Sequence, residues 1–265
     1  MARVFRPGQI ITGQSSSLFL LIIVTLLTST VVVLMLLAAR NDEEREKPWT
    51  ELLSWELSAF IYHNFLSKEE CEYLIKLAAP HLQKSAVVDP RTGKKTFSRF
   101  RTSSGMFLRR GQDMIIRTIE KRIANFTFIP VEHGENLQVL HYEVGQKYEP
   151  HYDYFTGKFN SEHIGQRIAT LLMYLSDVEE GGETVFPFAK FNSSSLPYYN
   201  GLSSCAKKGL SVKPKRGDAL FFWSIKQDGS EDPTSLHGGC PVIKGSKWSA
   251  TKWMRVNKFE YGYLP

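Results

Sequence analysis

The stretch Leu210-Ser-Val-Lys-Pro-Lys-Arg-Gly-Asp-Ala-Leu-Phe-Phe-Trp223 places two short apolar runs on either side of a turn. Residues 210–213 and 219–223 are typical of strands, and Arg216-Gly-Asp218 is typical of the turn that joins two strands. Outward from this stretch, further strand-like runs follow at 137–142, 168–175, 183–186, 235–238 and 247–253. Glu180-Gly-Gly182 and Lys244-Gly-Ser246 supply turns between them. The second half of the chain therefore predicts many short strands.

Two helices are predicted ahead of these strands. Ser67-x-x-Glu70 is a capping box that opens a helix running to about Ala79. Residues 113–125 form the second helix, with isoleucines four apart on one face at positions 115, 119 and 123. Helices followed by short strands indicate an α+β domain built on a β-sandwich or jelly roll. Residues 187–204, rich in Ser, Asn and Tyr, are expected to be a long insertion.

The N-terminal part contains an uncharged run over residues 18–39, long enough to cross a hydrocarbon core of about 30 Å. A cleaved signal peptide is the alternative, since Ala38 and Ala39 resemble a cleavage site. The length of the run and the lead before it favour an uncleaved signal anchor. We therefore expect a cytosolic tail (1–17), a transmembrane helix (18–39), a stem (40–56) and a lumenal domain (57–265).

The numbers of Lys and Arg residues on the two sides of the run do not decide the orientation of this anchor, because both flanks carry such residues. Two glycosylation sequons, at Asn125 and Asn192, favour a lumenal domain, as in a type II protein of the endoplasmic reticulum or Golgi. In an oxidising lumen Cys205–Cys240 is the first disulfide to consider. Three reduced, buried cysteines are the alternative.

The net charge of +6 is concentrated in one segment. Residues 91–110 hold seven Lys and Arg and no acidic residue, interspersed with Gly, Ser and Thr. We expect a mobile loop that is either simply solvated or covers a substrate. Binding of nucleic acid is not expected, because no stacking aromatics recur at regular spacing and the domain is expected to be lumenal.

Three sequence pairs could supply a histidine and a carboxylate to a metal: His133/Glu135, His141/Glu143 and His151/Asp153. The first belongs to a turn-like segment, and His141 lies in a predicted strand with apolar neighbours on its own face. Pro150 favours an extended backbone before His151. In an extended segment residues i and i+2 point to the same side. The sequence therefore favours the third pair.

A second histidine and a lysine complete the set. His237 supplies another imidazole, and Lys247 follows ten residues later as a cation for an acidic co-substrate. Two histidines and one carboxylate are the facial triad of non-haem Fe(II) oxygenases, which leaves open positions on the metal. A zinc site would more often use Cys or close all four positions.

Several motifs carry a resemblance to a known family. In chain order they are Arg101-Thr-Ser-Ser-Gly105, Tyr142, His151-Tyr-Asp153, Gly165-Gln-Arg167, Tyr174-Leu-Ser-Asp-Val-Glu-Glu-Gly-Gly-Glu-Thr-Val-Phe-Pro187, Lys213-Pro-Lys-Arg-Gly-Asp218 and His237-Gly-Gly-Cys-Pro-Val-Ile-Lys-Gly-Ser-Lys247. From about Phe60 onward the chain closely resembles prolyl 4-hydroxylases of the short membrane-anchored plant type. The resemblance implies a double-stranded β-helix (jelly roll) that uses Fe(II), 2-oxoglutarate, O₂ and ascorbate. The chain lacks the long peptide-binding region of collagen-type animal subunits.

The resemblance also implies roles for single residues. His151, Asp153 and His237 would bind Fe(II), and Lys247 would complete the catalytic set by holding the C5 carboxylate of 2-oxoglutarate. The hydroxyls of Tyr142 and Thr184 would contact the same co-substrate. The product would be 4-hydroxyproline, with succinate and CO₂ released.

Contacts to the prolyl substrate are expected from three residues. Three residues, Ser249, Thr251 and Trp253, have the same strand parity as Lys247, so all three can line the same cavity. Trp253 could stack on a proline ring, with a plain core role as the alternative. Arg167 and Tyr148 are assigned from the family pattern. An aromatic groove suits a polyproline II peptide.

The expected substrates are proline-rich secretory or cell-wall proteins of the extensin and arabinogalactan kind. The alternatives are the same chemistry on another residue or on one regulatory proline, and a catalytically inactive peptide-binding module. An oligomer with related hydroxylases is left open.

Overall fold

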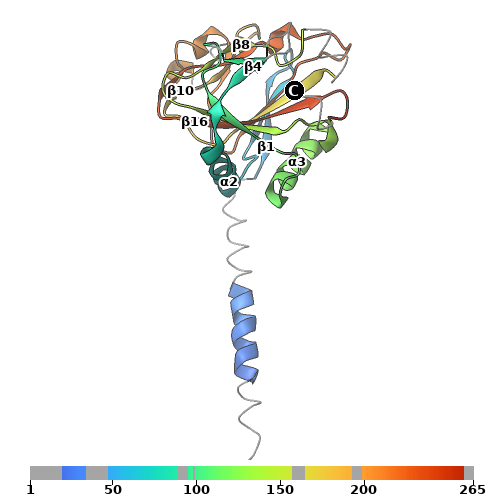
Figure 1. Cartoon of the computed structure of the whole chain (residues 1–265), viewed down its shortest axis with the longest axis vertical. Helices are drawn as coiled ribbons and strands as arrows, with labels where there is room; N and C mark the ends of the chain where they lie inside the picture. Colours follow the sequence, from blue (N-terminus) through green and yellow to red (C-terminus); the bar gives the residue numbers. More distant parts are fainter. Residues whose placement is uncertain are drawn as a thin grey trace, which may run out of the picture. The chain divides into compact units, whose positions relative to one another are not determined.

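A computed structural model of the chain describes residues 20–33, 47–88, 95–97, 99–156, 165–192 and 199–259. The chain divides into two compact units, Met1–Glu46 and Lys47–Pro265. In the first unit residues 20–33 form a helix, drawn in blue in Figure 1. The rest of the expected anchor 18–39 lies outside the described residues. Over the described parts of the chain, no helix has the length and apolar character needed to span a bilayer.

The second unit is built on a large antiparallel sheet and a smaller one. The strand order of the large sheet is β1 (Trp49–Ser54), β2 (Ala59–His63), β13 (Ala219–Trp223), β9 (Arg167–Tyr174), β16 (Lys247–Arg255), β7 (Leu137–Tyr142), β6 (Ser104–Leu108) and β3 (Gln83–Lys84). The order of the smaller sheet is β12 (Leu210–Val212), β11 (Thr184–Phe186), β14 (His237–Gly239) and β8 (Tyr148–His151).

Shorter elements surround these two sheets. Two ladders of paired strands are β4 (Ala86–Val88) with β5 (Lys95–Phe97), and β10 (Glu180–Gly181) with β15 (Val242–Lys244). The α-helices of this unit are α2 (Lys68–Ala78) and α3 (Met114–Thr127). Single 3₁₀ turns are η1 (Ala79–His81), η2 (Val131–His133), η4 (Tyr199–Gly201), η5 (Ala206–Lys208) and η6 (Pro233–Ser235). This core of antiparallel strands is consistent with the predicted jelly roll.

The two faces of the large sheet have different partners. Helices α2 and α3 lie together below the strands in Figure 1 and pack their apolar sides on one face. Because side chains alternate along a strand, Phe221 points to the helices while Phe222 points to the other face. There Phe222 packs with Phe186 of the smaller sheet. The space between the two sheets is where polar side chains gather.

Both predicted helices form, with the caps that their sequences indicate. Ser67 accepts a hydrogen bond from the Glu70 N–H at 3.1 Å, and the Glu70 carboxylate accepts one from the Ser67 N–H at 2.9 Å. This reciprocal pair is the predicted capping box. Asp113 caps α3 by accepting from the Ile116 N–H at 2.9 Å. Capping therefore sets where both helices begin.

The seven predicted strands all form, with ends that differ by at most two residues. The differences are confined to the strand ends, where assignments commonly vary by one or two residues. The interval 235–238, for example, begins inside the turn η6, and strand β14 starts only at His237. Strands β1 to β6, β8, β10 and β15 were not predicted as strands, because they are short, exposed or polar.

Two expectations are wrong in part. The expected stem 40–56 contains β1, which pairs with β2 at the sheet edge and belongs to the second compact unit. Exposed at its first half, β1 lacks the alternation that marks a strand. The basic segment 91–110, expected to be a mobile loop, contains β6, whose Leu108 is fully buried. Its many arginines masked this short strand. Residues 91–94 lie outside the described part.

The predicted disulfide is present. Cys205 and Cys240 are bonded, with their Cα atoms 5.8 Å apart, and Cys71 is a buried free thiol. The bond joins the segment around η5 to the residue that follows β14. The apolar side chains of Val185, Leu202 and Ala206 pack around it. The disulfide therefore attaches the 199–209 segment to the strand that carries His237.

Candidate metal centre

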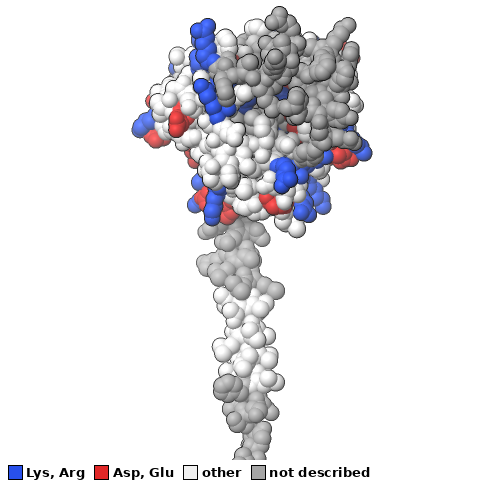
Figure 2. Space-filling model, viewed as in Figure 1, with Lys and Arg blue, Asp and Glu red and all other residues white. Residues whose placement is uncertain are grey.

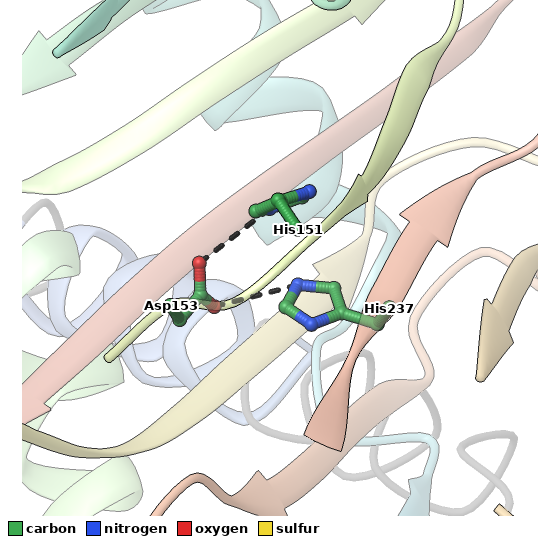
Figure 3. Close-up of side chains that lie close together, drawn as sticks. All are labelled: His151, Asp153 and His237. Carbon is green, nitrogen blue, oxygen red and sulfur yellow. Dashed lines mark ion pairs between the residues drawn. The ribbon is translucent and has the colours of Figure 1, made fainter. Parts of the chain in front are cut away.

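His151, Asp153 and His237 converge between the two sheets (Figure 3). His151 ends β8 and His237 begins β14, and these two residues are direct partners in the antiparallel pair. One ligand atom from each of the three side chains lies within 4.8 Å of the others. The Asp153 carboxylate oxygens are 3.6 Å from His151 Nε2 and 3.5 Å from His237 Nε2. The structure thus brings together the triad predicted from sequence.

Backbone carbonyls fix the orientation of both imidazoles. His151 Nδ1 donates to the Glu149 carbonyl at 2.9 Å, and His237 Nδ1 donates to the Ser235 carbonyl at 2.9 Å. Because Nδ1 carries the proton in each ring, the Nε2 lone pair faces the space between the three side chains. The ring of Tyr148 also stacks on His151, with centroids 3.6 Å apart. Both histidines are therefore held ready to act as ligands.

The protonation states of these groups suit a metal. Burial raises the pKa of Asp153, but the His237 and His151 imidazoles outweigh it and hold that pKa well below its usual range. Burial lowers the pKa of His237 to about 4, with Asp153 opposing the shift. At neutral pH the set contains an ionised carboxylate beside a neutral imidazole. These are the forms that bind a metal ion.

The triad lies in the wall of a cavity that is partly open to solvent. The lining comes from both sheets and is mixed apolar and polar: Arg101, Leu140, Tyr142, Tyr148, His151, Asp153, Thr170, Leu172, Thr184, Phe222, His237, Gly238, Gly239, Lys247, Ser249, Thr251 and Trp253. Of the nine predicted site residues, eight line this cavity, and Arg167 does not. Apolar walls with a few converging polar groups are typical of a site for a small organic molecule.

Lys247 supplies a buried cation to the same cavity. Its side chain is 3% exposed, and its ammonium donates to the Gly182 carbonyl at 2.7 Å. Burial lowers its pKa to about 8, and the more distant Glu183 opposes this shift. In the part of the chain that the structure describes, no carboxylate forms an ion pair with it. A carboxylate from a ligand can therefore take that place.

Two hydroxyls predicted for the site also line this cavity. Burial raises the pKa of Tyr142, so its phenol is protonated at neutral pH and can donate a hydrogen bond. The Thr184 hydroxyl accepts a hydrogen bond from the Tyr174 hydroxyl at 2.9 Å. That bond leaves the Thr184 proton free to be donated to a ligand. Together with Lys247 these groups form a donor-rich pocket.

The predicted substrate residues take three different positions. Trp253 lines the cavity, and its buried Nε1 has no hydrogen-bond partner among the described residues. Tyr148 lies between His151 and the Arg101 guanidinium, which is 4.7 Å from the Tyr148 ring centroid. Arg167 lies behind Trp253, 4.0 Å from its ring centroid, and forms a two-bond ion pair with Glu135. Arg167 thus acts on the cavity through Trp253.

The two rejected His pairs lie elsewhere. His141 stacks on Trp248 with ring centroids 4.2 Å apart, outside the cavity lining. His133 lies in η2 and bonds the Arg255 carbonyl through Nδ1 at 3.0 Å. Both follow the sequence argument that these histidines are packed or belong to a turn.

Sequence reasoning missed Arg101 and Thr170 as cavity residues. Arg101 donates to Gln138 at 2.8 Å, and its buried Nε has no partner among the described residues. Thr170 donates to Asp153 Oδ2 at 2.7 Å. Thr170 lies in an apolar strand and carries no motif. A signal for Arg101 was present, because this residue opens the quoted motif Arg101-Thr-Ser-Ser-Gly105. The basic charge of the surrounding segment nevertheless led us to place it in a mobile loop.

The donor set fits Fe(II). Two imidazole nitrogens and one carboxylate from three points of one wall leave the opposite side open for further ligands. In the residues that the structure describes, no cysteine lies among these ligands, so the thiolate sets of structural zinc do not apply. The neighbouring cation and hydroxyls suit an acidic molecule bound beside the metal.

Comparisons with known proteins agree with this geometry. Residues 137–255 match the 2OG-Fe(II) oxygenase superfamily. "Probable prolyl 4-hydroxylase 3" of Arabidopsis thaliana is 70% identical over 217 residues, covering 82% of this chain and 76% of that protein. "Prolyl 4-hydroxylase 5" of the same plant is 64% identical over 212 residues, covering 80% and 73%.

A solved structure has a similar fold. It is the viral collagen prolyl hydroxylase of Paramecium Bursaria Chlorella virus-1 in its 2OG complex, with a TM-score of 0.55 and 28% identity. The match covers 75% of this chain and 96% of the viral chain. The superfamily implies Fe(II), 2-oxoglutarate and O₂, for which the triad and Lys247 are suited. With its cavity, its triad and its relatives in agreement, this chain belongs to the prolyl 4-hydroxylase family of 2-oxoglutarate- and Fe(II)-dependent oxygenases.

Proposed function

We propose that this protein converts peptidyl proline to 4-hydroxyproline in proline-rich secretory or cell-wall proteins. One oxygen atom of O₂ enters the proline C4–H bond and the other enters succinate, while 2-oxoglutarate loses CO₂. The observation that carries the proposal is one cavity with the His151–Asp153–His237 triad on its wall and a buried Lys247, which forms no ion pair with a carboxylate of the described residues. Bound Fe(II) supplies the activation of O₂.

The protein's own residues bind and orient the co-substrate. Lys247 would form a charge-assisted hydrogen bond with the C5 carboxylate, and such bonds are stronger than neutral ones. Tyr142 and Thr184 would donate hydroxyl protons to the same molecule. Leu140, Leu172 and Phe222 give the cavity apolar walls, which exclude water from the reacting centre. Ligation by His151, Asp153 and His237 places the metal at the other end of the co-substrate.

Two unpartnered donors support a prolyl peptide as the substrate. Trp253 and Arg101 line the cavity, and their buried Nε1 and Nε atoms have no acceptor among the described residues. A buried donor without a partner costs about 1–3 kcal/mol, so an arriving acceptor restores that free energy. A prolyl residue has a carbonyl but no N–H, and polyproline II leaves its carbonyls unbonded. The cavity and the peptide are therefore complementary as donor and acceptor.

We further propose a type II protein of the endoplasmic reticulum or Golgi membrane, anchored through residues 18–39, with the catalytic domain in the lumen. The uncharged run at 18–39 supports an anchor, and the Cys205–Cys240 disulfide suits an oxidising compartment. Asn125 is exposed in the last turn of α3, where a glycan could extend, and Asn192 is exposed too. Ascorbate is the proposed reductant, and extensin-like and arabinogalactan-like proteins are the proposed substrates.

The test uses the full chain, purified in a mild detergent, with Fe(II), 2-oxoglutarate and ascorbate. Ser-Pro-rich, poly-Pro and collagen-like peptides are offered in parallel. Mass spectrometry locates added oxygen while succinate is quantified. Oxygen on proline in step with succinate, absent in His151→Ala, is the expected result. Succinate without peptide oxidation would point to another residue or another kind of peptide. Neither product, with iron bound, would favour an inactive peptide-binding module.

A further inference from the structure

The central strand β9 carries no triad residue and none of Tyr142, Thr184 and Lys247. Its side chains nevertheless form hydrogen bonds with Asp153 of the triad and with Thr184. Its cavity-side residues are Thr170, Leu172 and Tyr174, at alternate positions as strand geometry requires. β9 hydrogen-bonds β13 on one side and β16 on the other, so its backbone is held along both edges. Thr170 and Tyr174 are 1% and 0% exposed.

Thr170 acts on the metal end. Its hydroxyl donates to Asp153 Oδ2 at 2.7 Å, and Asp153 is itself buried. Asp153 follows β8 in a bend, so no strand pairing fixes the direction of its carboxylate. Rotation of that carboxylate would turn its oxygens away from His151 and His237. The Thr170 bond prevents this rotation and occupies a lone pair of one oxygen.

Tyr174 acts on the other end. Its hydroxyl donates to Thr184 Oγ1 at 2.9 Å, and Thr184 lies in β11 of the smaller sheet. A threonine hydroxyl has one proton and can rotate about its C–O bond. Because Tyr174 fills an acceptor position, the Thr184 proton is directed elsewhere, and the cavity lies on its free side. The aromatic ring of Tyr174 also lies 5.6 Å from the Lys247 ammonium.

We infer that Thr170 and Tyr174 are positioning residues that brace the two ends of the site from one strand. Thr170 holds the Asp153 carboxylate in its metal-binding direction, and Tyr174 holds the Thr184 hydroxyl toward the co-substrate. Neither residue would be a metal ligand, and neither would contact the reacting atoms. The inference rests on the proposed function for the identity of the co-substrate, 2-oxoglutarate.

A merely structural role would give a different result. If the two hydroxyls only satisfy buried polar groups, their removal lowers the melting temperature and weakens every ligand alike. Positioning instead separates the two ends of the site. The residues are four apart on one strand, and one metal ligand and one co-substrate contact lie at opposite ends. Each variant therefore serves as the control for the other.

The experiment compares Thr170→Val and Tyr174→Phe, which each remove a single hydroxyl at nearly constant shape. Calorimetry on the full chain in detergent measures the Kd of Mn(II), a redox-stable substitute for Fe(II). It then measures the Kd of 2-oxoglutarate at saturating Mn(II). We expect Thr170→Val to weaken Mn(II) binding about 10–100-fold, as for other residues that orient metal ligands. Its 2-oxoglutarate Kd at saturating metal should stay within about threefold.

Tyr174→Phe should give the opposite pattern. The Kd of 2-oxoglutarate is expected to rise about 5–10-fold, the effect of one net hydrogen bond, with the Mn(II) Kd within about threefold of wild type. Thr170→Ser keeps the hydroxyl and should restore Mn(II) affinity. Equal changes of both constants in both variants would overturn the proposal, as would a Thr170→Ser chain that binds Mn(II) as weakly as Thr170→Val.

Failure of the proposed function would be visible in the wild-type chain. Binding of Mn(II) and 2-oxoglutarate without proline oxidation would contradict the substrate and leave the bracing inference to be decided by the variants. A wild-type chain with no affinity for 2-oxoglutarate would contradict both the function and the role of Tyr174. The metal titration of the Thr170 variants would still decide the other half.

Discussion

Strand β16 buries two lysines on its opposite faces, and they are in opposite electrostatic situations. On the helix face, Lys252 is 2% exposed and forms an ion pair of 2.5 Å with Glu120 of α3. On the cavity face, Lys247 is 3% exposed and has the Gly182 carbonyl as its hydrogen-bond acceptor. The chain provides a carboxylate for the first lysine. For the second, we propose that a ligand provides the carboxylate.

The same contrast extends along both faces of the strand. Ala250 and Met254 join Lys252 on the helix face, in the main apolar core. Ser249, Thr251 and Trp253 share the cavity face with Lys247. The helix face thus has its buried lysine paired within the domain and stabilises the fold. The cavity face instead presents hydrogen-bond donors that can bind a ligand. A substitution on β16 should therefore affect stability or binding according to its face.

The largest effect is expected at the triad on the cavity side. His237→Ala should abolish measurable turnover, because two remaining ligands do not hold the metal in an active geometry. The fold should persist, since the side chain lies in a cavity wall. His141→Ala, which removes a stacked histidine outside the cavity, is the matched control and should retain turnover. Succinate release and circular dichroism are the measurements. Comparable turnover in both variants would contradict the assignment of the triad.

The second largest effect is expected on the helix face of β16. Lys252→Met leaves Glu120 buried without its cation, and breaking a buried pair costs about 3–5 kcal/mol. Urea unfolding should show this cost as a decrease in the free energy of unfolding. Lys252→Met with Glu120→Gln removes both charges and should recover much of it. If the single variant is as stable as wild type, the pair does not stabilise the helix face.

The third largest effect is expected at Lys247, on the cavity face of β16. Lys247→Met removes a buried charge that pairs with no carboxylate in the described part of the chain, so the empty domain should be as stable as wild type or more so. The Kd of 2-oxoglutarate should rise on the order of 100-fold, the loss of a charge-assisted hydrogen bond of about 2–3 kcal/mol. Mn(II) affinity should change far less. Equal losses of metal and co-substrate would mean that Lys247 has been misassigned.

A pH titration tests the same lysine without a substitution. Its pKa is lowered by burial to about 8, against about 10.4 in an unfolded chain. The charged form binds a carboxylate, so 2-oxoglutarate affinity should fall above pH 8 by up to about tenfold per pH unit. Between pH 8 and about 10.4 the unfolded chain carries a proton that the folded one lacks. This lysine should therefore make the free energy of unfolding rise with pH over that window.

Lys247→Met is the control for this titration, because it should lose both pH dependences. Calorimetry of 2-oxoglutarate binding at pH 7 to 9.5 and urea unfolding over the same range supply the data. A pH profile that is unchanged in Lys247→Met would assign the dependence to a different group.

The smallest effect is expected at the outer end of the helix layer. Ser67→Ala removes the N-cap of α2 and should lower the free energy of unfolding by about 1 kcal/mol. The Kd values for metal and 2-oxoglutarate should not change, since α2 packs on the face opposite the cavity. Ser67→Asp, which can still cap the helix, should restore stability. A change in co-substrate affinity would show that the two faces are coupled.

Much of the site was predictable because its chemistry depends on residue type. His151 and Asp153 were chosen among competing pairs by the extended backbone around Pro150, and the structure brings them within ligand distance of His237. Ser249, Thr251 and Trp253 were predicted from their parity with Lys247, and all three line the cavity. Alternation along a strand is a local property, so sequence suffices to assign a face.

Other residues could not be found in this way. Thr170 and Tyr174 lie in an apolar run that predicts only a buried strand, and their partners are 17 and 10 residues away. Arg101 was assigned to a mobile loop because its neighbours are basic, yet it is 6% exposed against Gln138 and Tyr148. Arg167 was expected at the substrate, but Glu135 holds it behind Trp253. These placements depend on contacts between distant segments.

The amino-acid sequence by itself determined the chemistry of this protein: which side chains can bind a metal, where helices begin and which strands alternate. These properties follow from residue type and local periodicity. The tertiary structure alone decided that Lys252 is paired with a carboxylate inside the domain and that Lys247, among the described residues, is not. It also decided which hydroxyls hold Asp153 and Thr184 in place. The physical reason is that ion pairs and hydrogen bonds in a buried site depend on distances between strands that sequence separation does not encode.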